Sequence, residues 1–563
     1  MRGAPFVALA AALLAACAEI DYSPDEWSYD GPVNSCRGGC AAGTCDPGLG
    51  VCALDPPAGV QLIARVVPGS STGVPPQAFA VDVGGGDAEF LLSSPVEVKA
   101  KTLAGEGSDV ASLQARVIFS DIGNRLPGRP ARVTVYEAYY SSVLDLALLP
   151  GAYDVIVIPG GGQAPSFPVA YLDGLTVDAD GKLLDSDGEA TDVIVPPAAA
   201  WVKGRITQVS APVNGLEVVA FDPATGRTAS TSDTTVCAQV SGETVCGYFE
   251  IGLSKSAVDS GAAFSLRVSR PSESSHPVFV ADGFTPPAAD GTLNLVGDSR
   301  LEFGALGVPV RAQIVVLKPV RDAAGATEYV PAPSCFVALV AADVAGGTVE
   351  TWVLTDESGE IEDAPGIVGV NLYAADYSVT VIPSHAATGA ADDYAVYTST
   401  EPWSVSEETA AVPLEIRLAE RPIAAGAVLA GGKTVPTSAV FAEPAPGEAS
   451  TARPNAGITG TTGRFGLRLD EASYVVAAEA PQESLYAWDL AAAAVTGASQ
   501  AFDLELPLPF VQRGTVGASP DQLNDIDLAG AVVEWYRVVD GRAYAVGRTA
   551  IGDDGGFAAL LPP

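Results

Sequence analysis

One strand-like phrase recurs along the chain and limits its fold more than any other feature. Residues 153–159 read Tyr-Asp-Val-Ile-Val-Ile-Pro, and residues 377–383 read Tyr-Ser-Val-Thr-Val-Ile-Pro. The alternation places the aromatic ring and both valines on one face of a β-strand. The proline then ends the strand, because it has no N–H to donate to a neighbour. Looser copies occupy 264–271 and 474–481.

Two glycine phrases accompany this strand. One reads Gly-x-apolar after a polar turn, and its successive glycines are 112, 104 and 92 residues apart, at Gly247, Gly359, Gly463 and Gly555. The other reads Gly-x-Ile or Gly-x-Val and opens a unit, at Gly204, Gly426 and Gly514. A period near 100 residues matches one β-sandwich domain. We therefore predict an all-β chain of serial seven-stranded, Ig-like sandwiches.

The order of these phrases resembles the carboxypeptidase regulatory-like domain, a transthyretin-like sandwich. Residues 201–270 carry the best copy, in which Lys203-Gly-Arg-Ile206 opens the unit, Phe221-Asp-Pro-Ala-Thr-Gly226 turns, and Gly247-Tyr-Phe249 follows. The resemblance implies a fold and an accessory role as spacer, stability module or adhesive repeat. It carries over no catalytic residue.

The repeats divide the chain into consecutive units. We predict a signal peptide (1–16), an acidic tether (17–30), a Cys-rich knot (31–57), four sandwiches (58–198, 199–304, 305–419 and 420–510) and a partial fifth sandwich (511–563). In the first unit a Tyr-x-Val strand comes next at the point where the fifth unit ends. The fifth unit is therefore expected to lack this strand and to leave an open sheet edge for another strand. The alternatives are a truncated reading frame and a smaller tail domain.

The N-terminus carries an export signal. Arg2 precedes an apolar stretch, 6–14, that is too short to cross a bilayer. The following Leu-Ala-Ala-Cys17 resembles the lipobox of bacterial lipoproteins. This resemblance implies cleavage before Cys17 and lipid on its sulfur, and Ala18 in place of aspartate favours the outer membrane of a Gram-negative bacterium. The alternative is an ordinary secretory peptide.

Most of the other cysteines are predicted to form disulfides, because an exported protein meets oxidising conditions. The segment of the first four has almost no bulky apolar residue, so cross-links must hold it, and it loosely resembles EGF-like knots. Three connectivities are open, and a four-thiolate zinc site is the alternative. Another pair flanks a Ser-Gly turn and can face across a hairpin, and Cys335 is expected to be a buried, inert thiol. The disulfide candidates are Cys36, Cys40, Cys45 and Cys52, and Cys237 with Cys246.

Charge excludes one class of partner. The chain has 68 acidic and 30 basic residues, a formal net charge of −38. Nucleic-acid binding needs a basic face and is therefore not expected. This negative charge would keep the chain soluble, because copies of it repel one another. The alternative is that divalent cations bridge the chain to an anionic envelope.

Two clusters could carry chemistry. Four aspartates spaced around two glycines suit Ca²⁺, although two ordinary Asp-Gly turns explain them equally well: Asp178, Asp180, Asp185 and Asp187. No other cofactor is expected. Lys203 on an opening strand, Asn294 on a closing strand and Glu250 between them could form a Lys–Asn cross-link of the kind found in some surface sandwiches.

Catalytic motifs are missing from the sequence, and His276 and His385 fall in loop contexts of different units. We therefore predict a non-enzymatic, lipid-anchored envelope protein that acts as a spacer, scaffold or adhesion module, with sandwiches stacked end to end. Its partners would be the membrane, through the anchor, and an envelope protein or glycan. The alternatives are a carbohydrate- or peptide-binding lipoprotein and a divergent enzyme. Sugar binding would need exposed tryptophans, whereas core packing is expected for Trp201, Trp352, Trp403, Trp488 and Trp535.

Overall fold

The structure is a computed structural model. It describes residues 29–70, 72–105, 111–138, 143–160, 167–208, 211–240, 242–269, 277–302, 309–321, 325–344, 347–355, 367–383, 393–448, 452–497, 500–519, 528 and 530–563. The signal peptide, Cys17 and most of the tether lie outside these residues, as do both histidines.

The described chain is almost entirely β and confirms the predicted sandwich class. Sandwich 2 (199–302) shows the common topology. Its first strand pairs with the fourth and, in parallel, with the seventh, while the second pairs with the third and fifth, and the fifth with the sixth. The seven strands in order are β16 (Ala200–Arg205), β19 (Glu217–Phe221), β20 (Thr228–Thr234), β22 (Glu243–Leu253), β23 (Phe264–Ser269), β24 (Val278–Phe284) and β25 (Thr292–Leu295).

Three other sandwiches repeat this order. Sandwich 1 (96–195) has β6 (Val96–Glu97) with β7 (Thr102–Ala104), β9 (Ala115–Asp121), β10 (Arg132–Ala138), β11 (Ala147–Leu148), β12 (Gly151–Pro159), β13 (Ala170–Val177) and β15 (Val193–Val195). Sandwich 3 (309–418) has β26 (Val310–Arg321), β28 (Cys335–Val344), β29 (Gly347–Leu354), β30 (Ile367–Leu372), β31 (Ala375–Pro383), β32 (Tyr397–Thr398) with β33 (Trp403–Val405), and β34 (Leu414–Arg417). Sandwich 4 (420–507) has β35 (Ile423–Ala430), β37 (Ala439–Pro444), β38 (Asn455–Ile458), β39 (Arg464–Arg468), β40 (Ser473–Ala478), β41 (Asp489–Ala494), and β42 (Gln500–Ala501) with β43 (Leu504–Glu505).

The fifth sandwich is assembled from both ends of the described chain. Its first four strands are β44 (Phe510–Ala518), β45 (Val532–Val539), β46 (Arg542–Ala550) and β47 (Gly556–Leu561). Its last three are β3 (Gln61–Val67), β4 (Gln77–Asp82) and β5 (Ala88–Leu92). β3 pairs with β45 as a fifth strand should, and β5 runs parallel to β44 as a seventh strand should. We call this unit the composite sandwich.

This arrangement corrects the predicted division at both ends of the chain. The predicted unit 58–198 contains a complete sandwich (96–195) preceded by three strands that belong elsewhere. The predicted partial unit 511–563 is not partial, because β3 fills the edge expected to be open. Periodicity identifies each strand, but it cannot say which distant strand will be the partner.

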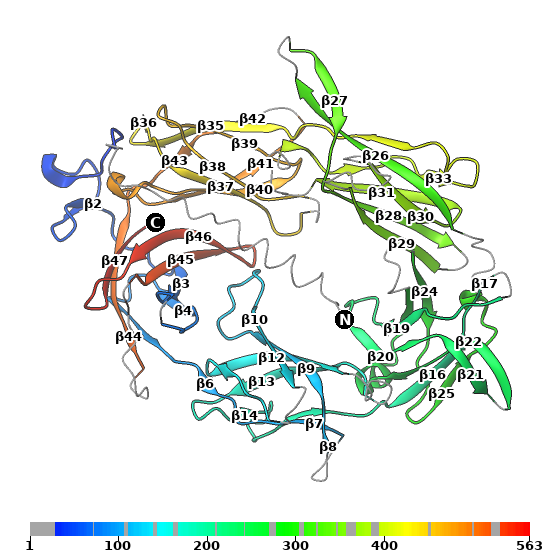
Figure 1. The fold of residues 1–563 in the computed structure, drawn as a ribbon. Coiled ribbons are helices and arrows are strands. Elements are labelled where there is room, and N and C mark those ends of the chain that lie inside the picture. Colours follow the sequence, from blue (N-terminus) through cyan, green and yellow to red (C-terminus); the bar gives the residue numbers. More distant parts are fainter. Residues whose placement is uncertain are drawn as a thin grey trace.

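The closure also changes the predicted arrangement of the sandwiches. An end-to-end stack would hold the first and last strands far apart, whereas here they share one core. Figure 1 shows the sandwiches following one another around a closed circuit, with the red C-terminal strands beside the blue strands β3 and β4. The junction between sandwiches 2 and 3 is a continuous sheet, because β24 pairs directly with β29.

The recurrent glycines have a shared structural cause. The opening glycine lies opposite a phenylalanine of the fourth strand in three sandwiches, in the pairs Gly204–Phe249, Gly426–Phe465 and Gly514–Phe557. A Cβ at any of these glycines would come within 2.4–3.0 Å of the phenylalanine ring. The two sequence phrases are therefore halves of one contact, in which an aromatic ring covers bare backbone.

The aromatic residue of the recurrent strand forms a tyrosine corner. The Tyr153 hydroxyl donates to the Leu149 carbonyl at 2.8 Å, and the Tyr377 hydroxyl donates to the Tyr373 carbonyl at 3.0 Å. Both hydroxyls reach four residues back, as in Ig-like sandwiches. The tyrosine thus fixes the turn that enters the fifth strand as well as filling the core.

Replacing Tyr377 by phenylalanine is expected to destabilise sandwich 3 by about 1 kcal/mol, since the hydrogen bond from the Tyr377 hydroxyl to the Tyr373 carbonyl is lost. Chemical denaturation and amide hydrogen exchange of 367–383 would measure this. The matched control is Tyr329→Phe, whose ring is 40% exposed, and its effect should stay within about 0.5 kcal/mol. Equal effects of the two changes would contradict the corner as the cause.

Candidate functional site

The cysteine knot is the first candidate region. Its disulfides are Cys36–Cys45 and Cys40–Cys52, which selects one of the three open connectivities and leaves no thiolates for the zinc alternative. Its secondary structure is limited to η1 (Cys36–Gly38), β1 (Thr44–Asp46) and β2 (Val51–Ala53). Cross-links therefore do what a hydrophobic core does elsewhere in the chain.

The knot is docked at the junction between sandwich 4 and the composite sandwich. The buried Asn34 side chain donates to the carbonyls of Cys52 and Leu485, at 2.9 and 3.0 Å. The Leu54 N–H donates to the Pro509 carbonyl at 2.8 Å. The knot is thus part of the folded body and does not hang from it as a separate bead.

An ion pair fixes the same junction. Arg513 Nη2 lies 2.8 Å from both carboxylate oxygens of Asp46. Burial by itself would raise the pKa of Asp46, but the hydrogen bonds from Arg513 and from the Leu49 and Gly48 amides outweigh it, so the pKa lies below its ordinary value. Asp46 is therefore ionised, and its carboxylate binds the Arg513 guanidinium.

The remaining cysteines behave as predicted. Cys237 and Cys246 are disulfide-bonded across the hairpin of β21 (Val236–Val240) and β22. Cys335 is a buried free thiol at the start of β28, and burial raises its pKa to about 11. A thiol with this pKa is protonated at neutral pH and is a poor nucleophile.

Two of the four candidate calcium ligands, Asp178 and Asp185, cap their own turns. Asp178 Oδ1 accepts the amides of Asp180 and Lys182 at 2.9 and 2.8 Å. Asp185 Oδ1 accepts those of Asp187 and Glu189, both at 3.0 Å. Nowhere in the described ranges do three His, Cys, Asp or Glu side chains gather as a metal site requires. The geometry matches the alternative of two Asp-Gly turns, and calcium stays a hypothesis.

The three residues considered for a Lys–Asn cross-link are neighbours. Lys203 lies opposite Glu250 on one side and Asn294 on the other, and its Nζ is 3.1 Å from Glu250. All three occupy the outer, partly exposed face of the sheet. Because the partly exposed Lys203 side chain is already engaged by Glu250, this placement does not favour the cross-link.

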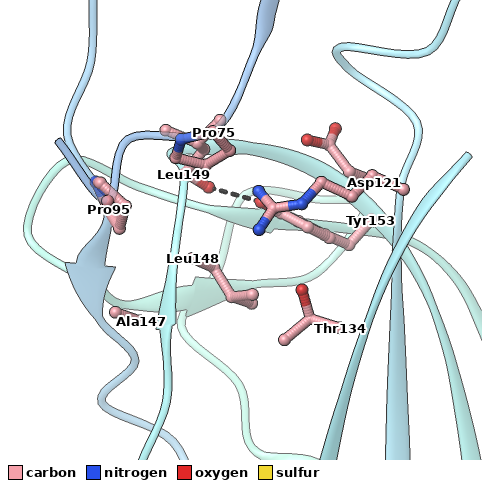
Figure 2. Close-up of a pocket in the computed structure, with 10 residues that line it drawn as sticks. Pro75, Pro95, Asp121, Thr134, Ala147, Leu148, Leu149 and Tyr153 are labelled. Carbon is pink, nitrogen blue, oxygen red and sulfur yellow. Dashed lines mark hydrogen bonds between the residues drawn. The ribbon is translucent and has the colours of Figure 1, made fainter. Parts of the chain in front are cut away.

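A hollow lies between sandwich 1 and the hairpin of β3 and β4. Figure 2 shows Asp121, Thr134 and Tyr153 on its wall, with the Tyr153 hydroxyl bonded to the Leu149 carbonyl. Asp121 is also committed, since its two oxygens accept the main-chain and side-chain N–H groups of Asn124, both at 3.0 Å. The lining residues thus hold no nucleophile with an adjacent base.

Two of the five tryptophans depart from the expected core packing: Trp201 is only partly buried, on the same outer face of β16 as Lys203, and Trp352 lies on the outer face of β29. Trp535 is fully buried, but the Trp352 side chain is 47% exposed on the outer face of β29. The Phe336 ring lies beside it, tilted by 35° and with the ring centroids 5.0 Å apart, and Leu354, 55% exposed, extends the surface. We call Phe336, Trp352 and Leu354 the aromatic platform. The alternation of residues along β29 does not say whether Trp352 faces the core or the solvent, because either face of a strand can carry apolar side chains.

A buried charge cluster joins sandwiches 3 and 4. Asp470 lies 3.0 Å from the guanidinium of Arg421 and 3.2 Å from that of Arg453. Arg453 also donates to the Pro383 carbonyl at 3.1 Å and to the Tyr394 carbonyl, both in sandwich 3. Burial lowers the pKa of Arg421, and Asp470 counters that effect. Sequence patterns do not reveal this cluster, because Arg421, Arg453 and Asp470 lie far apart in the sequence and share no motif.

A second ionic contact joins three sandwiches. Glu443 of sandwich 4 lies 2.7 Å from Arg129 of sandwich 1 and 3.0 Å from Arg542 of the composite sandwich. Arg129 also donates to the Ala543 carbonyl at 2.9 Å. These contacts tie the closed circuit together across positions far apart in sequence.

Buried tyrosines set an alkaline limit on stability. Burial raises the pKa of Tyr153, Tyr377 and Tyr536 in the folded chain. A tyrosine in the unfolded chain has a pKa of about 10. Below that pH their stabilising effect is complete, and it is lost as the pH rises from there towards the raised folded pKa. Stability should therefore fall steeply above about pH 10, and the last part of the rise in tyrosinate absorbance should accompany unfolding. Ionisation of all the tyrosines well before unfolding would contradict this.

Comparisons with known proteins add little beyond the fold. No family model matches the chain, and no curated protein matches it. Solved structures similar to it include the Bacillus anthracis TIE protein (11% identity, 72% of this chain and 73% of that one, TM-score 0.17). Others are the shaft pilin SpaA of Lactobacillus rhamnosus GG (9%, 35% and 98%, 0.17) and the RrgB pilus protein of Streptococcus pneumoniae (10%, 72% and 93%, 0.12). At such identities and TM-scores the likeness says nothing about function.

Among the described residues, no helix is long and apolar enough to cross a membrane. The lipid anchor on Cys17 stays a prediction from the sequence, since the described chain begins at Tyr29.

Proposed function

We propose that this protein is a non-enzymatic, lipid-anchored scaffold of the bacterial cell envelope, in which five sandwiches are held in a closed circuit. The observation that carries the proposal is the composite sandwich, since β3, β4 and β5 complete a unit whose other four strands lie more than 400 residues away. Ionic and hydrogen-bonded contacts at the other junctions add rigidity. A fixed arrangement of surfaces suits a scaffold and does not suit an extended spacer.

The docked knot supports a position close to the membrane. Only 11 residues, 18–28, separate the predicted anchor, Cys17, from Tyr29, which packs against the core of sandwich 4. A fully extended segment of that length spans at most roughly 40 Å. Sandwich 4 and the composite sandwich would therefore lie near the lipid surface of the membrane that holds the anchor, which we propose is the outer membrane of a Gram-negative bacterium.

Two measurements test this function. Fatty-acid labelling and membrane fractionation should place the wild-type chain in the membrane fraction, and Cys17→Ser should lose both the label and the membrane association. Chemical cross-linking in the envelope should then capture the same partners repeatedly for the anchored chain. Membrane association of an unlabelled Cys17→Ser chain would refute the anchor, and the lack of any captured protein or glycan would refute the scaffold.

A second candidate function is ligand binding at the aromatic platform. Trp352 and Leu354 are 47% and 55% exposed and lie with Phe336 on one outer sheet face. An exposed tryptophan ring can stack on a sugar or a peptide side chain. Binding of envelope glycans and peptides to residues 18–563 should weaken at least tenfold in Trp352→Ala, and no binding to the unaltered chain would remove this candidate.

A further inference from the structure

The composite sandwich consists of two units that every copy of the chain carries. The donor unit is residues 29–92, comprising the knot with β3, β4 and β5. The acceptor unit is residues 510–561, comprising β44 to β47. The acceptor holds the first four strands of the common topology and the donor holds the last three. Each unit therefore lacks what the other supplies.

The two units share a single core. Phe90 of the donor stacks on Phe557 of the acceptor at 5.5 Å and lies 6.1 Å from Trp535. Buried donor residues Leu62, Ala64 and Val66 belong to the same cluster. Separated, either unit would expose this apolar surface together with an unpaired strand edge, and such an edge recruits another strand.

The donor makes most of its long-range polar contacts with the acceptor and sandwich 4. Arg65 pairs with Glu534 at 3.3 Å, and Asp46 pairs with Arg513. The link to the next sandwich is only three residues, 93–95, and it ends in proline. A short hinge that joins an exchangeable element to its own body is the usual site of domain swapping.

Synthesis order leaves time for exchange. The donor emerges first, while the acceptor emerges only after the four intervening segments that form sandwiches 1 to 4. During that interval donors and acceptors of neighbouring chains are equally complementary, because every contact within the composite sandwich would be identical between two copies. Non-local pairing of this kind is slow and prone to exchange in multidomain chains.

We propose that the composite sandwich also forms between copies, with the donor unit of one chain completing the acceptor unit of the next. A second copy of this chain is the partner. Reciprocal exchange gives a closed dimer, and head-to-tail exchange gives an open filament of continuous sandwiches. The proposal does not depend on the lipid anchor or on the proposed envelope function.

Single cysteines at paired positions test the exchange. Arg65 and Glu534 are cross-strand partners on the outer face of β3 and β45. Arg65→Cys and Glu534→Cys chains of residues 18–563 are mixed at high concentration, opened in mild denaturant, returned to buffer and oxidised. A disulfide-linked heterodimer should exceed the control level at least tenfold and increase with concentration, because residues 65 and 534 then come from different chains.

The controls separate exchange from random oxidation. Arg65→Cys mixed with Arg267→Cys, an exposed strand position in sandwich 2 without residue 65 as partner, sets the background. The double variant Arg65→Cys with Glu534→Cys, opened and oxidised at low concentration, should close within one chain and shows that the pair can form. If the double variant closes and the mixed single variants stay at background at every concentration, the proposal is overturned.

Discussion

Replacing Trp535 by alanine should destabilise the composite sandwich by about 3–5 kcal/mol and should loosen both ends of the folded chain together. Trp535 is among the largest fully buried side chains and contacts Phe90 of the donor and Phe557 of the acceptor. Its loss removes packing that neither neighbour can replace. Amide hydrogen exchange should therefore accelerate in 61–92 as well as in 510–561, while sandwiches 2 and 3 keep their protection.

Two other variants make that result specific. Trp535→Phe should cost much less than the alanine change, because a ring remains and the indole N–H has no hydrogen-bond partner among the described residues. Trp352→Ala, at an exposed position, should leave the exchange of 61–92 unaltered. If Trp535→Ala loosened only 510–561, the N-terminal strands could not belong to the same sandwich.

Replacing Asp470 by alanine should cost about 3–5 kcal/mol at the junction of sandwiches 3 and 4. Asp470 is the carboxylate that Arg421 and Arg453 share, and the Arg421 side chain is fully buried. Without Asp470, two guanidinium groups would face each other in a region that water reaches poorly. Chemical denaturation should detect the loss, and proteolysis should become faster near 383 and 453, where Arg453 bridges the two sandwiches.

A nearby exposed ion pair provides the comparison. Glu420 lies 3.4 Å from Arg468 at the same junction, but its side chain is 38% exposed. Glu420→Ala should therefore cost no more than about 1 kcal/mol. Similar losses for Asp470→Ala and Glu420→Ala would show that burial is not the source of the effect.

Local patterns predicted much of the fold. The Tyr-x-Val-x-Val phrase located the fifth strands β12 and β31, and the two glycine phrases located opposite members of one contact. These predictions succeeded because alternation and a bare glycine beside an aromatic ring are requirements that a short segment meets by itself. The cysteine spacing likewise identified the disulfide-bonded residues, although it left the pairing within the knot open.

The candidate sites were less accessible from the sequence. The four aspartates look alike as calcium ligands and as turn residues. The two readings are distinguished only by the backbone hydrogen bonds that Asp178 and Asp185 accept within their own turns. Arg421, Arg453 and Asp470 carry no shared motif, since they meet through tertiary packing alone.

The sequence by itself determined that this chain is a series of sandwiches with a cross-linked knot, because strand alternation, turns and cysteine content are local properties. Only the tertiary structure decided that the last sandwich is complete and that the circuit is closed. Residues 61–67 and 532–539 each look like half-buried strands with any of several partners. Their pairing follows from the shared core around Phe90 and Trp535, which exists only when both segments are folded together.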